Sequence, residues 1–333
     1  MKKADCGRLV DAIDLLIEKA DDDLELEISG MGYAAAADAV THVNAIEDAV
    51  ATILGKREST LLKRMKKADS LTKFIENVWP EIEEKQDVID ALHDLFKEEF
   101  EQMMRGFTGE FFLSKNPVVA EGFFADERLT TPAQDFITGW SEELAQIMNL
   151  NSKNQIESIL LRAADKGMTI EETAEKIADA GIRTAGYKAR RVAITEVLRA
   201  ESYAQMEYMR QDPVVIKKTW IETYEAEEPR PNHIDISGQT VFKNEPFTLI
   251  GKDGGTYRPM QPRDTGLPAS EVIHCHCTME EVRDDKRLGM TADELKQLRQ
   301  EAMDKIDAEW EEKVKKLNEE RAKKYDANGV YVG

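Results

Sequence analysis

The hydrophobic positions of residues 1–110 recur with the spacing of helices. Two segments place apolar residues at i, i+3, i+4 and i+7, which puts each set on one face of a helix. These residues are Leu9, Val10, Ile13, Leu16 and Ile17 in the first segment, and Val43, Ile46, Val50, Ile53 and Leu54 in the second, before a stop signal at Gly55. Pro80 suits the first turn of a further helix, because a proline there loses no hydrogen bond. We therefore interpret residues 1–110 as a helical assembly module.

The helical period is interrupted by glycine and proline between Gly106 and Pro132. This stretch is rich in phenylalanine, at positions 107, 111, 112, 123 and 124. Apolar residues without a helical period indicate a packed connector, which we place at residues 111–132. A docking segment for a partner is the alternative.

Helices are predicted again over residues 133–210. Thr169 and Glu172 have the spacing of a capping box, and Gly181 fits the end of the helix that this box begins. A second capping box, from Thr291 to Glu294, begins a long charged helix in the C-terminal helical tail of residues 286–333. That helix carries one apolar stripe and is suited to contact a partner or a second copy of the chain.

Short β-branched segments replace the helical pattern after Pro213. Residues 214–221, 239–242 and 272–278 predict strands, and several glycines and prolines separate them. We expect a small α+β core over residues 214–282. The predicted fold class is thus α+β and predominantly helical, with a helical N-terminal region, short strands near 214–280 and a long C-terminal helix.

Composition and charge limit the classes of partner. A formal net charge of −20 argues against a general nucleic-acid binder, because phosphate neutralisation needs concentrated Lys and Arg. One basic helix, with Lys188, Arg190 and Arg199, keeps a DNA or partner contact open as a hypothesis, and a solvated helix face is the simpler interpretation. Three cysteines in 333 residues fit a reducing compartment, and no segment has the about 20 consecutive apolar residues that span a membrane.

The densest chemical signal is the run from His274 to Cys277, with His233 upstream of it. In a strand, Cys275 and Cys277 would point to one face and His274 and His276 to the other. Two thiolates at this spacing can bind one zinc ion, with His233 and with His274 or His276 completing a tetrahedron. Two alternatives to a metal site stay open: cysteines as small buried hydrophobic residues, and a redox pair or thiol nucleophile beside His233, whose imidazole Asp235 or Glu225 would orient.

The order of several motif residues resembles the phage Mu protein F-like family, the minor capsid and head morphogenesis proteins of tailed bacteriophages. The residues that carry the resemblance are Arg191, Thr195, Glu196, Trp220, Arg230, His233, Gly238, Cys275 and Cys277. It covers residues 130–285, and we assign residues 133–285 to a Mu F-like domain with helices over 133–210. Two departures are His276, where the family commonly has Arg, and the acidic run 225–228, where it commonly has an Asp-rich turn.

The resemblance implies a minor head protein that acts in procapsid assembly near the portal and assists DNA packaging or ejection. Its implied partners are the portal and the capsid or scaffold proteins. Its implied location is the capsid interior of the virion, after synthesis in the cytoplasm of a bacterial host. The alternative is a metal-dependent or thiol enzyme, a hydrolase or transferase, built on residues 215–280; the resemblance favours a structural protein over an enzyme.

Overall fold

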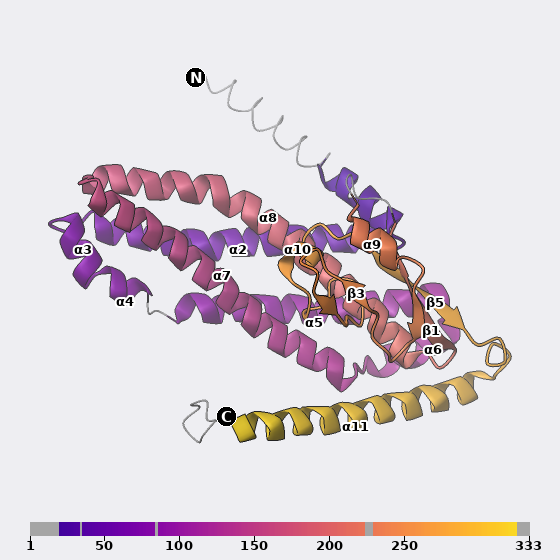
Figure 1. The fold of residues 1–333 in the computed structure, drawn as a ribbon. Helices are drawn as coiled ribbons and strands as arrows, with labels where there is room; N and C mark the ends of the chain where they lie inside the picture. The colour runs from indigo at the N-terminus through magenta and orange to yellow at the C-terminus, as the bar shows by residue number, and fades with distance from the viewer. Residues whose placement is uncertain (1–19, 34, 84–85, 224–228, 325–333) are drawn as a thin grey trace. The chain divides into compact units, whose positions relative to one another are not determined.

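The computed structural model describes residues 20–33, 35–83, 86–223 and 229–324. The predicted helix from Leu9 to Ile17 lies outside these residues. The chain divides into two compact units, one of Met1–Met103 with Ile137–Ala200 and one of Met104–Phe136 with Glu201–Gly333. Three long helices, α5, α7 and α8, contribute residues to both units (Figure 1). The predicted domain boundaries at 110, 132 and 285 stay a prediction. They separate segments by expected function, whereas the two units are defined by compactness alone.

The first unit is helical throughout its described residues. Residues 20–30 form its first described helix. The labelled helices that contribute to it are α2 (Ala36–Met65), α3 (Leu71–Asn77), α4 (Trp79–Glu83), α5 (Asp87–Lys115), α7 (Thr131–Asp165) and α8 (Ile170–Gln211). One core cluster joins five of these helices through Leu61, Met65, Leu71, Phe74, Trp79, Ile82, Leu160, Ala163, Ala174 and Ile177. The predicted capping box is present, since Thr169 N donates to Glu172 Oε2 at 2.8 Å and Glu172 N donates to Thr169 Oγ1 at 3.2 Å.

Several helices run past the glycines that were expected to end or interrupt them. Gly55 lies inside α2, Gly106 and Gly109 lie inside α5, and Gly181 lies inside α8. The expected loss of helical structure between Gly106 and Pro132 is therefore wrong, because α5 continues to Lys115 and α6 (Pro117–Asp126) follows. A glycine costs only about 1 kcal/mol in a helix relative to alanine, and packing of the flanking turns offsets that cost.

The phenylalanines of this stretch are mostly core residues of the second unit. Phe107, Phe111, Phe112 and Phe123 are buried, and the rings of Phe112 and Phe123 lie 5.4 Å apart. Phe124 is exposed. The packing interpretation therefore describes these residues better than the docking alternative.

The second unit contains two small antiparallel sheets. Strands β1 (Val215–Ile221), β2 (Thr240–Phe242) and β5 (Thr278–Arg283) form one sheet in the order β2-β1-β5. Strands β3 (Leu249–Ile250) and β4 (Thr256–Tyr257) form the other. Two short helices, α9 (Pro231–Ile236) and α10 (Ala269–Val272), lie in the connections between strands. The predicted strands near 214–221 and 239–242 are confirmed, and so is the predominantly helical α+β class.

The predicted strand over residues 272–278 is wrong. Val272 ends α10, residues 273–277 have neither helix nor strand structure, and β5 begins at Thr278. Just after this loop, the Gln205 side chain of α8 fixes the start of β5: its Nε2 donates to Met279 O at 2.7 Å and its Oε1 accepts from Met279 N at 3.2 Å.

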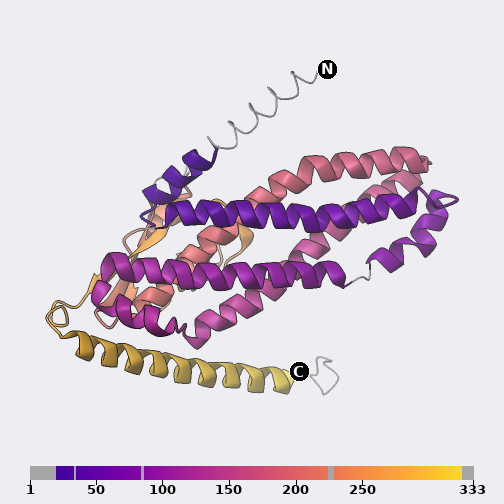
Figure 2. The ribbon, with the colours of Figure 1, turned by 180° about the vertical axis from the view of Figure 1, so that it is seen from behind.

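The predicted C-terminal helix is present as α11 (Ala292–Lys324), which contacts α6 (Figure 2). Its capping box is formed, with Thr291 N donating to Glu294 Oε2 at 2.8 Å. Arg128 holds it by ion pairs to Asp304 and Asp307, at 3.1 and 2.7 Å. None of the described helices is both long enough and apolar enough to span a bilayer.

Candidate metal centre

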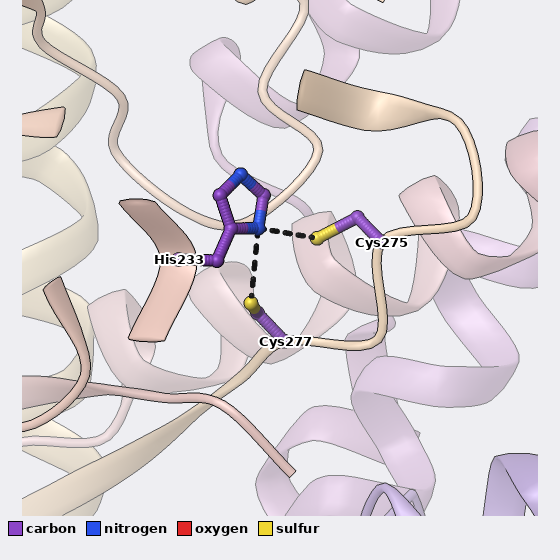
Figure 3. Close-up of side chains that lie close together, drawn as sticks. All are labelled: His233, Cys275 and Cys277. Carbon is purple, nitrogen blue, oxygen red and sulfur yellow. Dashed lines mark hydrogen bonds between the residues drawn. The ribbon is translucent and has the colours of Figure 1, made fainter. Parts of the chain in front are cut away.

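Three side chains from two distant segments converge in the second unit. His233 Nδ1 lies 3.6 Å from Cys275 Sγ and 3.3 Å from Cys277 Sγ (Figure 3). All three side chains are buried, with exposures of 1%, 1% and 0%. Within the described ranges, this is the cluster of His, Cys and acidic side chains whose ligand atoms are close enough together to hold a metal ion.

Helix α9 presents His233, and Glu271 orients its ring. Pro231 occupies the first turn of α9, where its fixed φ favours helix and its missing N–H costs nothing. His233 Nε2 lies 2.9 Å from Glu271 Oε2, inside a buried pair. An ionised carboxylate accepts only, so Nε2 carries a proton, and Nδ1 is the ring atom that faces the two sulfurs.

The Glu271 carboxylate is held ionised by its neighbours. Burial raises the pKa of this carboxyl, but hydrogen bonds from Lys252 N, Asn232 and His233 outweigh burial and leave the pKa below its usual value. Lys252 N donates at 2.8 Å and Asn232 Nδ2 at 2.9 Å. The acceptor that orients His233 is therefore charged, as in the carboxylate–histidine pairs of many metal sites.

Two arginines hold the loop of residues 273–277. Arg230 Nε donates to Ser270 O at 2.8 Å, and its guanidinium also donates to Ile273 O and to His274 O. Arg263, buried with 1% exposure, donates to Cys275 O and, at 2.7 Å, to Ser202 Oγ. The guanidinium groups thus donate to backbone carbonyl oxygens that, in a strand, would accept hydrogen bonds from a neighbouring strand.

The conformation of His274 gives this loop its turn. His274 has φ of +52°, in the left-handed region that residues other than glycine rarely adopt. Its side chain is exposed, and that of His276 is half-buried. Neither belongs to the cluster formed by His233, Cys275 and Cys277. The structure thus brings together three of the five predicted ligands.

Two further motif residues join α9 to strand β1. Trp220 is fully buried, and its ring stands edge-on to that of His233, with 6.1 Å between centroids. Gly238 has φ of +87°, which favours glycine, and its N–H donates to Trp220 O at 2.8 Å. Glu222 N donates to Ser237 Oγ at 3.0 Å. Together, Trp220 and Gly238 fix α9 against the end of β1.

The two cysteines differ in their affinity for a proton. Hydrogen bonding from Cys277, with support from His233 and Arg263, holds the pKa of Cys275 well below its usual value. Burial, and then the neighbouring Cys275, raise the pKa of Cys277. Burial lowers the pKa of His233, but Cys275 and Glu271 outweigh burial and raise it. Cys275 is therefore the more acidic thiol of the pair. The sulfur of Cys277 also lies 2.9 Å from Glu222 Oε2, a second acceptor available to its one proton.

Glu222, Glu271 and Arg263 were not among the residues predicted for the site. Asp235, which was expected to orient His233, is exposed, and Glu271 takes that role. Glu225, the other expected partner, lies outside the described residues. Acidic residues are so common in this chain, at 65 of 333, that residue type alone could not single out Glu222 or Glu271.

The motif residues on α8 lie in the first unit. Thr195 Oγ1 donates to the backbone carbonyl of Arg191 at 2.8 Å. Glu196 accepts from Trp140 Nε1 at 2.7 Å and from Arg199 Nε at 2.9 Å. These contacts join turns of α8 to one another and to α7, which is a structural role.

The arginines proposed for DNA contact are engaged within the first unit. Arg190 pairs with Asp21 at 2.7 Å and with Glu47 at 3.1 Å. Arg199 pairs with Glu196 and lies over the Trp140 ring, 4.4 Å from its centroid. The Lys188 side chain lies outside the described residues. The DNA-contact hypothesis therefore gains no support from these two arginines.

The fold and the buried cluster define a class: a mostly helical α+β protein whose small sheet carries a His–Cys–Cys site. Residues 154–280 match the family described as Phage Mu protein F like protein, which supports a Mu F-like assignment for this part of the chain. The matched segment holds all of α8 and all three clustered residues. The family indicates a phage head morphogenesis protein with capsid-related partners.

One similar protein is the uncharacterized protein YqbB of Bacillus subtilis strain 168. It is 28% identical over 319 residues, which cover 91% of this chain and 99% of that protein. No solved structure is significantly similar to this chain. The resemblance predicted from the motif residues is thereby confirmed at the level of the family.

Proposed function

We propose that the chain is a minor head protein of a tailed bacteriophage, which acts in procapsid assembly beside the portal. The observation that carries this proposal is the Mu F-like match over residues 154–280. The proposed partners are the portal protein and the capsid or scaffold proteins, and the proposed location is the capsid interior. From that position the protein would assist DNA packaging or ejection.

The architecture supports an assembly role for the chain. The described part of the first unit is helical, and α11 presents a long, largely charged surface beyond its buried contacts at Leu295, Met303 and Ile306. Extended helical faces of this kind are common contact surfaces between proteins. A net charge of −20 makes protein partners a better match than DNA.

Burial of the cluster favours a stabilising role over the enzyme alternative. A thiol nucleophile or an open metal position must be reached by its substrate. His233, Cys275 and Cys277 are each at most 1% exposed. Buried cysteines are also less reactive than exposed ones beside a cation.

Affinity purification of the portal protein from infected cells tests the assembly proposal. The tag is placed on the portal, and the expected result is that this chain co-purifies with it, in cells that make capsid protein and in cells that do not. Cells carrying an untagged portal are the control. Recovery of the portal without this chain in both kinds of cell would contradict the proposed portal contact.

A further inference from the structure

We propose that His233, Cys275, Cys277 and Glu222 bind one zinc ion, which locks helix α9, the 273–277 loop and the end of strand β1 together. This inference is separate from the proposed role in head assembly, because it concerns how the second unit is stabilised. It rests on distances, burial and charge within that unit.

The spacing of the three clustered ligand atoms matches a tetrahedral zinc site. With Zn–S near 2.3 Å and Zn–N near 2.0–2.1 Å, a tetrahedron places nitrogen and sulfur about 3.5 Å apart. The observed distances from His233 Nδ1 to the two sulfurs are 3.6 and 3.3 Å. These two distances are each within a few tenths of an ångström of the tetrahedral value, and the three ligand atoms all lie within 4.8 Å of one another.

Glu222 is the carboxylate that contacts the cluster, through Cys277; it lies outside the group of atoms within 4.8 Å of one another, so its side chain must shift to become the fourth ligand. It follows β1 directly, is 5% exposed, and places Oε2 2.9 Å from Cys277 Sγ. Its backbone N–H is fixed by Ser237 Oγ, in the turn that follows α9. A carboxylate beside a thiol is a normal neighbour in a zinc site, where Asp and Glu oxygens bind at about 2.0–2.2 Å.

Charge balance also favours a cation at this position. With both cysteines deprotonated, two thiolates and a carboxylate would share one buried space, and burying charge without compensation is costly. A divalent ion neutralises two of these three negative charges, and the Arg263 guanidinium, which donates to Cys275 O, lies beside them.

The surroundings of the three ligands resemble the outer layer of a structural metal site. Glu271 holds the remaining ring nitrogen of His233, which fixes the tautomer that binds metal through Nδ1. Arg230 and Arg263 hold the carbonyls of the loop that carries both cysteines. Soft thiolates with one imidazole select zinc over magnesium or calcium, which prefer oxygen ligands. Four protein ligands in a buried position make a closed, structural site.

The test uses full-length protein without a polyhistidine tag, expressed with zinc and purified under reducing conditions. Elemental analysis is expected to give about one zinc per chain, and X-ray absorption at the zinc edge two sulfurs at about 2.3 Å and two nitrogen or oxygen ligands at about 2.0–2.2 Å. Wild-type protein with less than one tenth of that zinc, or zinc with only oxygen and nitrogen neighbours, would overturn the proposal.

Variants assign the individual ligands. Cys275→Ser and Cys277→Ser should lose the stoichiometric zinc, whereas His274→Ala and Cys6→Ser are matched controls that should keep it. Retention of zinc by either of the first two variants would contradict the assignment. Because those variants risk misfolding, Glu222→Gln gives a milder test: zinc affinity, measured by competition with a chelator, should fall by at least about 10-fold, the lower end of the loss seen when only an outer partner of a ligand is removed. An unchanged affinity would remove Glu222 from the ligand set.

These measurements are independent of head assembly. A chain that binds zinc but does not associate with the portal leaves this inference standing and overturns the proposed function. A chain that associates with the portal but holds no zinc leaves the proposed function standing and overturns the zinc site.

Discussion

At the scale of single residues, Lys218 is an unusual ionisable group among the described residues outside the cluster. It lies on β1 with 0% exposure, and its Nζ donates to Met260 O at 2.7 Å and lies above the ring of Phe247. Burial, together with the charge of Arg210, lowers its pKa to about 6. Lys218 is therefore neutral in the folded protein at pH 8, although the unfolded chain binds a proton there.

This difference in proton binding predicts a pH dependence of stability. Between pH 6 and 10 the unfolded state holds one more proton at Lys218, so the free energy of unfolding rises with pH by about 1.4 kcal/mol per unit. Lys218→Met removes that contribution. From pH 6.5 to 8.5, the free energy of unfolding of wild type relative to Lys218→Met should rise by about 2–3 kcal/mol, as measured by urea titration.

The neighbouring Lys217 provides the control for this prediction. It lies on the same strand, is only half-buried and contacts the ring of Phe242. Lys217→Met should follow the pH dependence of the wild type. If the stability of Lys218→Met has the same pH dependence as the wild type, Lys218 is charged in the folded state, which contradicts the prediction.

The candidate site was only partly predictable from single residues. The crowding of His and Cys between 233 and 277 identified His233, Cys275 and Cys277, because these types are rare in this chain. It also suggested His274 and His276, which the structure leaves outside the cluster. Glu222 reaches Cys277 across 55 positions of sequence, and only the pairing of β1 with β5 brings them together.

At the scale of elements, helix α5 contains two glycines in contrasting surroundings. A Cβ on Gly106 would meet no atom within 4 Å, whereas one on Gly109 would lie 2.7 Å from the Phe124 ring. Gly109 thus allows α6 to approach α5 closely. Gly106 has no packing reason to be glycine in the described structure.

Matched alanine substitutions in α5 should therefore act in opposite directions. Gly106→Ala should raise the free energy of unfolding by about 0.5–1 kcal/mol, because alanine restricts the unfolded chain and favours helix. Gly109→Ala should lower it by about 1 kcal/mol, the low end of overpacking costs, because the new methyl group displaces the exposed Phe124 ring. Chemical denaturation of both variants checks this pair. Equal effects would mean that the contact between α5 and α6 tolerates a methyl group.

Elements were predictable where local signals and tertiary contacts agree. Strand β1 has a β-branched sequence and pairs on both sides, and both capping boxes form as expected. The strand at 272–278 does not form, and Arg230 and Arg263 instead bind the carbonyls of Ile273, His274 and Cys275. Nothing in the local pattern of residues 272–278 reveals arginines 12 to 44 positions away.

At the scale of the whole molecule, the domains predicted from sequence are continuous segments of the chain, whereas the compact units of the structure are not. The sequence divides the chain by changes of pattern at 110, 132 and 285, whereas each compact unit draws on separate stretches of the chain. Long helices such as α8 cause this difference, since one helix supplies residues to both units. Periodicity predicts that such a helix exists, but it cannot tell which residues belong to which unit.

The proposed function makes this chain a component of the phage head. Quantitative mass spectrometry of purified procapsids and virions from the source phage tests it most directly. We expect peptides of this chain in procapsids, at low copy relative to the major capsid protein and in a fixed ratio to the portal. Procapsids and virions that contain the portal and the capsid protein but no peptide of this chain would contradict it.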